Sequence, residues 1–384
     1  MRLLILLIKW GFPLLLATDL SSELLDSEFV LNISRGLRIV LLFLIIKENI
    51  RRYAIIKRYY FFRYFSMFLF VSFLYLFTDR NIFEGFWTFS KTLFWVLGTN
   101  VLYAYGYLNL LKLNDFEKVV ESVVIIAFIF TLLFYFSGSM ETDYNVAAYL
   151  VLFMYPLLLY TSEGYLKNKI FIVLSAFAIL ITLKRGAMIA FVSGNIVYFF
   201  GNLIHDFKVK KLAAGALIFF SMTFAGLSIY QGQEDSREER FSQDQFDVTN
   251  EKAGSGRVGM YTRLYEGWLH SDNRIFGFGN QADSYRTFGR RTHAHSDVFG
   301  FLYNHGIVGV SLILILYVKL LKFYFSYRNY NKKNSPVLLS FFVILVLVNF
   351  YSGMFRTQDA IYFFALLPYL QLRRDAIRQS TYID

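Results

Sequence analysis

Uncharged apolar runs recur along most of this 384-residue chain, and many approach the length of a bilayer crossing. About 20 apolar residues in a helix span roughly 30 Å of hydrocarbon. Backbone polar groups in lipid must be satisfied within their own segment, which favours helices. With 56% hydrophobic residues as well, the sequence predicts an all-α polytopic membrane protein.

The runs predict about twelve transmembrane helices, at residues 3–18, 29–46, 59–77, 86–110, 119–138, 146–160, 170–183, 187–204, 212–230, 298–318, 335–352 and 358–372. Those starting at 146, 170 and 358 are short, so tilted or re-entrant geometry stays open for them. We therefore divide the chain into residues 1–230 with nine helices, a large partly helical loop at 231–297, and residues 298–384 with three helices and a tail.

Charge sets the predicted orientation. With the N-terminus inside, the inner connections carry about twenty Lys and Arg, against about four in the short outer loops. Both termini are then cytoplasmic and the large loop lies outside. The inner basic residues account for most of the net charge of +11, so no nucleic-acid partner is predicted. We assign the abundant aromatic residues, 44 Phe and 28 Tyr, to lipid-facing surfaces and interfacial belts.

The large loop has two halves. Residues 231–256 are polar and acidic, which is typical of disorder. From Arg257 onward, apolar residues at helical spacing predict an amphipathic helix over 258–270 on the bilayer or on the outer rim of the bundle, and Gly277-Phe278-Gly279 predicts a tight turn. Arginine outnumbers acids in this half, so it should attract an anion; the candidate binding residues are Arg263, Arg290 and Arg291.

Arg185 is a candidate phosphate ligand. It lies in a minimal break between two apolar runs at the outer surface, and its planar fork suits a phosphate or pyrophosphate. The alternative is a side chain that only snorkels to water. Arg38 and Lys91, in the outer halves of their predicted helices, are further substrate-binding candidates, with the same alternative.

His295 is a candidate general base because it lies next to the start of a predicted transmembrane helix, and a neutral imidazole can accept a proton from a sugar hydroxyl. The alternative is an interfacial histidine without a chemical role. His293 beside it invites a zinc proposal, but no further ligands follow at a fixed spacing, so no metal and no cofactor are predicted. Cysteine is absent, which excludes disulfides and thiol nucleophiles.

Four motifs together resemble the O-antigen ligase and O-antigen polymerase superfamily of bacterial membrane glycosyltransferases. They are Lys184-Arg185-Gly186, Gly256-Arg257 with Tyr261, Gly277-Phe278-Gly279, and His295-Ser296 with Gly306 and Gly309. The resemblance covers roughly residues 170–320. The chain has Ser296 where the family often has Asn, Tyr261 where it usually has Trp, and no proline before the Gly-x-Gly turn.

The resemblance implies a metal-independent, inverting glycosyltransferase of the bacterial inner membrane, whose site faces the periplasm and whose donor is a glycan on undecaprenyl pyrophosphate. Arg185 and Arg257 would hold the pyrophosphate, and His295 would activate the acceptor hydroxyl. The acceptor is another glycan in a polymerase or lipid A-core in a ligase. Membrane lipids are implied partners, and for a polymerase also a chain-length regulator. The run from Ala294 to Asp297 resembles polymerases more closely.

A polysaccharide flippase is the alternative from another class, because it would also need about twelve spans and intramembrane cations. The single large outer loop argues against it, since alternating access needs no such segment. Inverted hydropathy repeats would support transport, and the sequence has none that we recognise.

Overall fold

The computed structural model describes residues 2–78, 82–137, 144–161, 166–182, 184–205, 253–288 and 295–381. Within these ranges every regular element is a helix and there is no strand. The all-helical prediction is therefore correct. The expected span at 212–230, residues 231–252 of the large loop, Arg290, Arg291 and His293 lie outside the described residues, as does the side chain of Arg185. Residues 253–256, expected in the disordered half of the loop, instead begin a helix that continues to Leu269.

Nine of the described helices belong to the first half of the chain. They are α1 (Arg2–Leu25), α2 (Glu28–Arg51), the short α3 (Tyr53–Ile56), α4 (Phe62–Leu76), α5 (Ile82–Tyr107), α6 (Leu113–Ser137), α7 (Tyr144–Thr161), α8 (Leu166–Ile181) and α9 (Arg185–His205). Each of them except α3, which lies between two predicted apolar runs, overlaps such a run. The contacts of α1 with α2 and α6, and of α7 with α6 and α8, build one side of the bundle.

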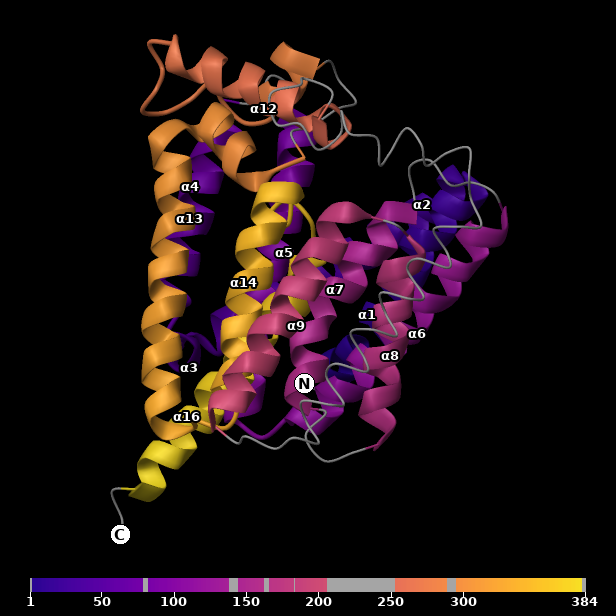
Figure 1. Ribbon diagram of the computed structural model, residues 1–384, viewed down its shortest axis with the longest axis vertical. Coiled ribbons are helices and arrows are strands. Elements are labelled where there is room, and N and C mark those ends of the chain that lie inside the picture. Colours follow the sequence, from indigo (N-terminus) through magenta and orange to yellow (C-terminus); the bar gives the residue numbers. More distant parts are fainter. Residues whose placement is uncertain are drawn as a thin grey trace.

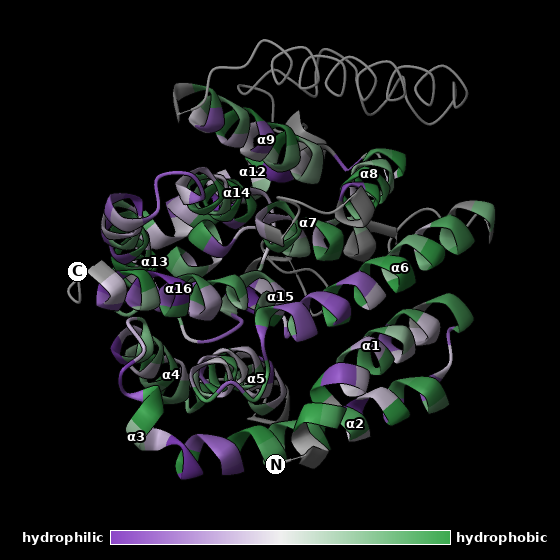
Figure 2. Ribbon diagram, turned by 90° about the horizontal axis from the view of Figure 1, so that it is seen from below, coloured by the Kyte–Doolittle hydropathy of each residue, from purple (hydrophilic) through white to green (hydrophobic). Residues whose placement is uncertain are grey.

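The second half contributes a surface helix and the remaining bundle. Its elements are α12 (Ala253–Leu269), a π-helical turn η2 (Asp283–Phe288), α13 (Asp297–Tyr330), α14 (Ser335–Tyr351), α15 (Ala360–Phe364) and α16 (Leu366–Thr381). Figure 1 shows α12 lying across one end of the bundle, with the C-terminus at the opposite end. Seen from that opposite end, α15 and α16 lie between α4 and α5 on one side and α14 on the other (Figure 2).

Three described helices are long and apolar enough to cross a membrane by length and composition, namely Glu28–Arg51, Gly186–Leu203 and Asp297–Tyr330. Four others are apolar but shorter: Phe62–Leu76, Ala148–Tyr160, Lys169–Ile181 and Ser335–Tyr351. The expected run at 358–372 is divided into α15 and α16. The count of about twelve spans therefore stays a prediction.

Aromatic side chains fill the interior of the bundle as well as its surface. Trp95 is fully buried, stacks on Phe364 with ring centroids 4.9 Å apart and meets Phe65 edge-on at 5.4 Å. Other aromatics such as Phe43 and Phe70 are 74% and 62% exposed. The assignment of aromatics to lipid-facing positions was therefore only partly right, because large rings also provide the close packing that holds helices together in lipid.

The predicted helix at 298–318 is present within α13, but it is interrupted at Gly306, whose φ of 62° and ψ of −151° are not helical. The groups freed by the break bond to the preceding loop. The Phe278 and Gly279 N–H groups donate to the carbonyls of Tyr303 and Asn304, at 3.0 and 2.9 Å. On the other side of the break, the N–H groups of residues 307 and 308 donate to the carbonyls of residues 274 and 275, at 3.0 and 3.2 Å. A break at membrane depth is tolerated when its polar groups are satisfied in this way.

The predicted Gly277-Phe278-Gly279 turn is confirmed, with φ of 70° and 100° at its two glycines. A Cβ on Gly277 would lie 2.6 Å from the Gly306 nitrogen, and a Cβ on Gly306 would lie 2.6 Å from the Gly277 nitrogen. Both glycines are therefore required by conformation and by close approach. The two motifs, separate in sequence, form one interlocked unit.

Residues 352–359, between α14 and α15, form a partly buried non-helical segment that we call the strap. Met354 and Phe355 within it are 0% and 1% exposed. Their N–H groups donate to Oδ2 of Asp297 at 2.6 and 3.2 Å, and the Phe355 carbonyl accepts the Trp95 indole N–H at 3.2 Å. The sequence predicted only a short outer loop here. It gave no sign of these hydrogen bonds, because the groups that bond the backbone of the strap lie more than 50 residues away in the chain.

Candidate active site

Arg257 and Gly186 both contact Tyr149, a buried residue of α7. The Tyr149 hydroxyl donates to the Tyr351 carbonyl at 3.4 Å, and the side chains of Arg257 and of Ser352 in the strap lie beside this hydroxyl. A Cβ on Gly186 would lie 2.6 Å from the same hydroxyl and 2.8 Å from Cβ of Tyr351. The absence of a side chain at Gly186 therefore lets the first turn of α9 approach α7 and the end of α14 closely.

Tyr261 joins α12 to the helices below it. Its ring stacks on Phe299 with centroids 4.5 Å apart, and its hydroxyl lies 2.9 Å from the His295 carbonyl and 3.0 Å from the Phe350 carbonyl. Burial raises the pKa of Tyr261 to about 12, although the Arg257 charge acts in the opposite direction. The hydroxyl therefore stays protonated at neutral pH and remains a donor to these carbonyls.

His295 lies immediately before α13, and its side chain is exposed. Its position is held on both sides: Tyr261 bonds its carbonyl, and the next residue, Ser296, caps α13 by accepting from the Phe299 N–H at 3.3 Å. The Ser296 hydroxyl also donates to the Asn349 carbonyl at 2.9 Å. An exposed imidazole on a fixed backbone is suited to proton transfer with a bound molecule.

Three segments that are far apart in sequence thus meet around Tyr149 and the end of α14. They contain Arg185, at the first residue of α9, Arg257 on α12, and His295 before α13. We call Tyr149, Arg257, Tyr261 and His295 the outer cluster. No carboxylate in the described part of the chain forms an ion pair with Arg257. Its charge is therefore available to an anion.

A second buried group lies next to the interlocked glycines and was not predicted. The Asp283 carboxylate accepts from Asn304 Nδ2 at 2.7 Å and from Arg356 Nη1 at 3.1 Å, and the Asp283 N–H donates to Asn304 Oδ1 at 2.8 Å. Asp283 is fully buried. We call these three residues the Asp283 clamp; it ties η2 and α13 to the strap.

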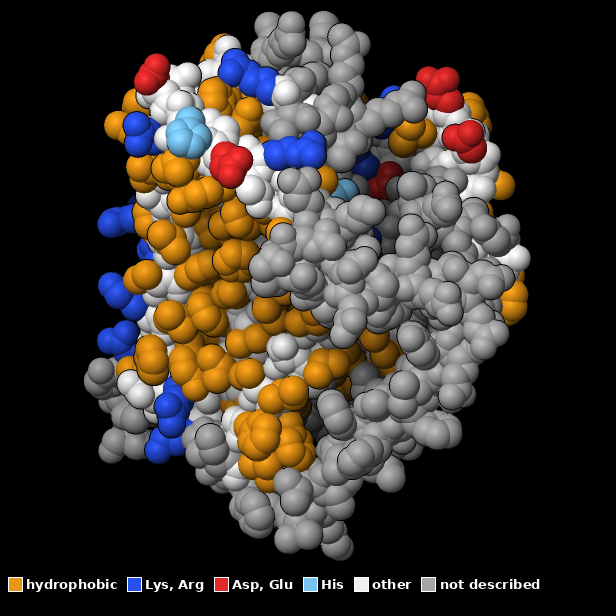
Figure 3. Space-filling model, turned by 45° about the horizontal axis from the view of Figure 1, so that its top comes forward, with side chains coloured by type: hydrophobic (Ala, Val, Ile, Leu, Met, Phe, Trp, Pro, Cys, Tyr) orange, Lys and Arg blue, Asp and Glu red, His pale blue; other side chains and the backbone are white. Residues whose placement is uncertain are grey.

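The other predicted site residues do not belong to the outer cluster. Arg263 is exposed on α12, and Arg38 and Lys91 belong to a separate polar group on α2 and α5. In the described ranges no three His, Asp or Glu side chains lie together as a metal site. Figure 3 shows Lys and Arg side chains around α12, above apolar side chains that cover the flank of the bundle.

Sequence reasoning missed Tyr149, Asp283 and Arg356. Tyr149 lies in an apolar run where nothing separates it from a lipid-facing aromatic. Arg356 did carry a signal, because it is a basic residue in a predicted outer loop, as Arg185 is. Only the fold reveals its partner, 73 residues away.

The fold and this site define a helical membrane protein with a cationic cluster at one end of its bundle. Residues 170–315 match the family model described as O-antigen ligase. This segment contains Arg185, Arg257 and His295, and the match confirms the resemblance to the O-antigen ligase and polymerase superfamily. It supports a membrane location and a function of O-antigen ligase or polymerase type. No curated protein matches the chain.

Proposed function

We propose that this protein is a polymerase of O-antigen or a similar surface polysaccharide. It transfers a glycan from undecaprenyl pyrophosphate to a sugar hydroxyl, at the periplasmic face of the bacterial inner membrane. The observation that carries the proposal is the convergence of the first turn of α9, Arg257 and His295 around Tyr149 and the end of α14. The family match supports the general class of reaction.

In the proposed reaction the acceptor oxygen attacks the anomeric carbon of the donor. The bond from that carbon to the pyrophosphate oxygen breaks, and the acceptor proton passes to the His295 imidazole. Attack opposite the leaving group inverts the anomeric centre. No bound metal is required if fixed cations stabilise the charge that develops on the leaving group.

Arg185 and Arg257 are the proposed ligands of the pyrophosphate. Arg257 lies near the neutral hydroxyls of Tyr149 and Tyr261, and no carboxylate of the described chain forms an ion pair with it. The N-terminus of α9, which begins at Arg185, adds partial positive charge from its free N–H groups. Arg263, Arg290 and Arg291 are proposed to attract the same anion from the surrounding loop.

Ligase activity is the second candidate, because the matching family model is itself described as O-antigen ligase. The donor chemistry is the same, and only the acceptor differs: lipid A-core in place of a lipid-linked glycan. In both cases the two termini are proposed to be cytoplasmic, with α12 and the outer cluster on the periplasmic side.

A knockout strain complemented with variants tests the proposal by gel analysis of the surface glycan. We expect His295→Ala to abolish polymer, whereas His270→Ala, which alters an exposed histidine just beyond the end of α12, should keep it. One repeat unit on core in the knockout identifies a polymerase. Bare core with accumulated lipid-linked chains identifies a ligase. Full-length glycan from the His295→Ala variant would rule out the general-base role.

A further inference from the structure

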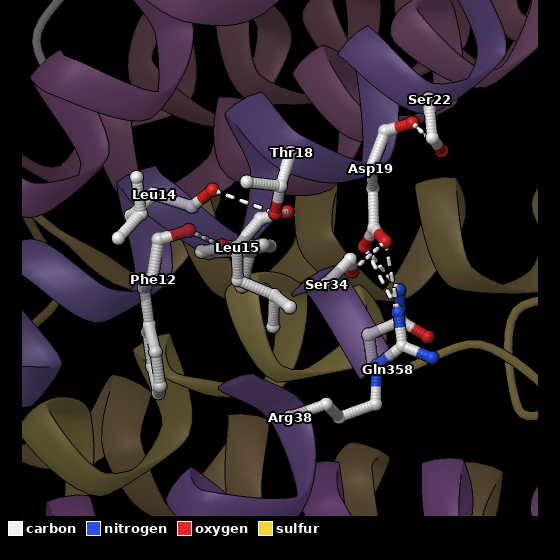
Figure 4. A network of polar contacts seen from close by, with 10 residues as sticks. Phe12, Leu14, Leu15, Thr18, Asp19, Ser22, Ser34, Arg38 and Gln358 are labelled. Atoms are coloured by element: carbon white, nitrogen blue, oxygen red, sulfur yellow. Dashed lines mark hydrogen bonds and ion pairs between the residues drawn. The ribbon is translucent and has the colours of Figure 1, made fainter. Parts of the chain in front are cut away.

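A second cationic group lies between α1, α2, α5 and the strap, and Asp19 is at its centre. The Asp19 carboxylate accepts from Arg38 Nη2, with both oxygens at 3.0 Å, and from Gln358 Nε2 at 3.1 Å. The Ser34 hydroxyl donates to it as well (Figure 4). The carboxylate oxygens of Asp19 are therefore occupied, and its ion pair is with Arg38.

Two further cations stand close to this pair. The guanidinium groups of Arg38 and Arg35 lie 5.0 and 5.8 Å from the centre of the same Trp87 ring. Lys91 lies one helical turn beyond Trp87 on α5 and therefore projects on the same side of the helix. We call Arg35, Arg38, Trp87 and Lys91 the second cationic cluster.

Among the side chains that the structure describes, the carboxylates of this region do not balance its cations. The acidic groups that act on Lys91 are Asp359 of the strap and Asp19, so three described cations face two described acids. Among the residues that the structure describes, no carboxylate lies within ion-pair distance of Lys91. The Arg38 side chain is 6% exposed and its Nε has no hydrogen-bond partner.

Uncompensated positive charge inside a helix bundle is costly, and a free buried N–H adds to that cost. An anionic ligand would remove both penalties. Guanidinium and ammonium groups together suit a phosphate, because the fork supplies directed N–H donors and the ammonium supplies a compact charge.

We infer that the second cationic cluster binds a lipid-borne phosphate of the acceptor, so that the protein holds two phosphorylated lipids at once. The inference rests on the proposed function, in which the outer cluster holds the donor pyrophosphate. In a polymerase the second ligand is the diphosphate of another polyprenyl-linked glycan. In a ligase it is a phosphate of lipid A-core.

The strap connects the two sites. Ser352 lies beside Tyr149 at the outer cluster, and Gln358 bonds Asp19 at the second cluster. Six peptide units separate these residues, so their Cα atoms are at most about 20 Å apart. Two lipid-anchored saccharides held at this separation can bring their sugar ends together beside His295.

Native mass spectrometry of the purified full-length protein with added undecaprenyl pyrophosphate tests the inference. A polymerase should bind two molecules per chain. Lys91→Gln should bind one, with at least a tenfold loss of affinity at the second site, and Lys47→Gln, an exposed lysine of α2, should bind two. A ligase should bind one undecaprenyl pyrophosphate and one lipid A-core molecule, the latter lost in Lys91→Gln.

Three results would overturn the inference. The first is that Lys91→Gln binds both lipids as the wild type does. The second is that phosphatidylglycerol at equal concentration displaces the second ligand. A lower unfolding temperature of ligand-free Lys91→Gln would also count against it, because removal of an uncompensated cation should leave stability equal or higher. Arg257→Gln separates the two proposals: if it loses no donor lipid the outer site is wrong, whatever Lys91→Gln does.

Discussion

Arg257 and Arg356 are both arginines at the end of the bundle that carries α12, yet their surroundings differ. The partners of Arg257 are the neutral hydroxyl of Tyr149 and the nearby Tyr261. Arg356 pairs at 3.1 Å with Asp283, which is fully buried. Removing one partner of a buried ion pair leaves an uncompensated charge and is strongly destabilising, and Arg257 has no such pair among the described residues. We therefore propose that Arg257 acts in catalysis and that Arg356 stabilises the fold.

The largest effect is expected from Asp283→Asn. It leaves the Arg356 charge partly buried without a carboxylate, and breaking such a pair costs about 3–5 kcal/mol. The purified variant in detergent should unfold at a lower denaturant concentration than the wild type. The double variant Asp283→Asn with Arg356→Met should recover part of the loss, because it removes the orphaned charge. If Asp283→Asn were as stable as the wild type, the ion pair with Arg356 would not stabilise the fold, and the contrast between Arg356 and Arg257 would be wrong.

Arg257→Lys should lower activity while stability stays near the wild-type value. Lysine keeps the charge but loses the fork, for which we expect a loss of about 100-fold, or ~2.7 kcal/mol in the barrier. Polymer yield in the complemented knockout measures it. Arg274→Lys, an exposed arginine beyond the end of α12, is the matched control and should keep full activity. A large fall in the unfolding temperature of Arg257→Lys would mean that Arg257, like Arg356, stabilises the fold.

Gly306→Ala tests whether the break in α13 supports the Asp283 clamp. An alanine would have to adopt a positive φ, and its Cβ would lie 2.5 Å from the Arg274 and Ile275 carbonyl oxygens. We expect a loss of about 2 kcal/mol in stability. Gly36→Ala is the control, because nothing lies within 4 Å of a Cβ there and a helix interior favours alanine. If both variants are equally stable, the break is not required.

The smallest effect is expected from Tyr261→Phe, which keeps the ring on Phe299 and removes only the hydroxyl. Loss of its bonding to the His295 and Phe350 carbonyls should cost about 1 kcal/mol. Activity should fall by about tenfold if the position of His295 matters. Tyr265→Phe, at an exposed position on the same helix, should change neither property. A Tyr261→Phe variant with unchanged activity would mean that this bond does not position His295.

Much of the fold could be predicted from the sequence because its signals are local. Apolar run length indicated most of the described bundle helices, and helical spacing near Tyr261 indicated α12. The Gly-x-Gly turn was also correct, because a glycine pair of this kind allows conformations with positive φ. The break at Gly306 was not predicted, since the carbonyls and N–H groups that stabilise it belong to residues 274–279.

The sequence by itself determined that this protein is helical and apolar enough for a membrane. It also determined that the cationic motifs follow the order seen in a known superfamily. Those properties follow from run length, charge asymmetry and residue spacing along the chain. Only the tertiary structure decided which cations pair with carboxylates and which have neutral neighbours. Asp283 reaches Arg356, Asp19 reaches Arg38 and Tyr149 reaches Arg257 across distant segments. Pairing between charges depends on distance in space, and no pattern along the chain specifies it.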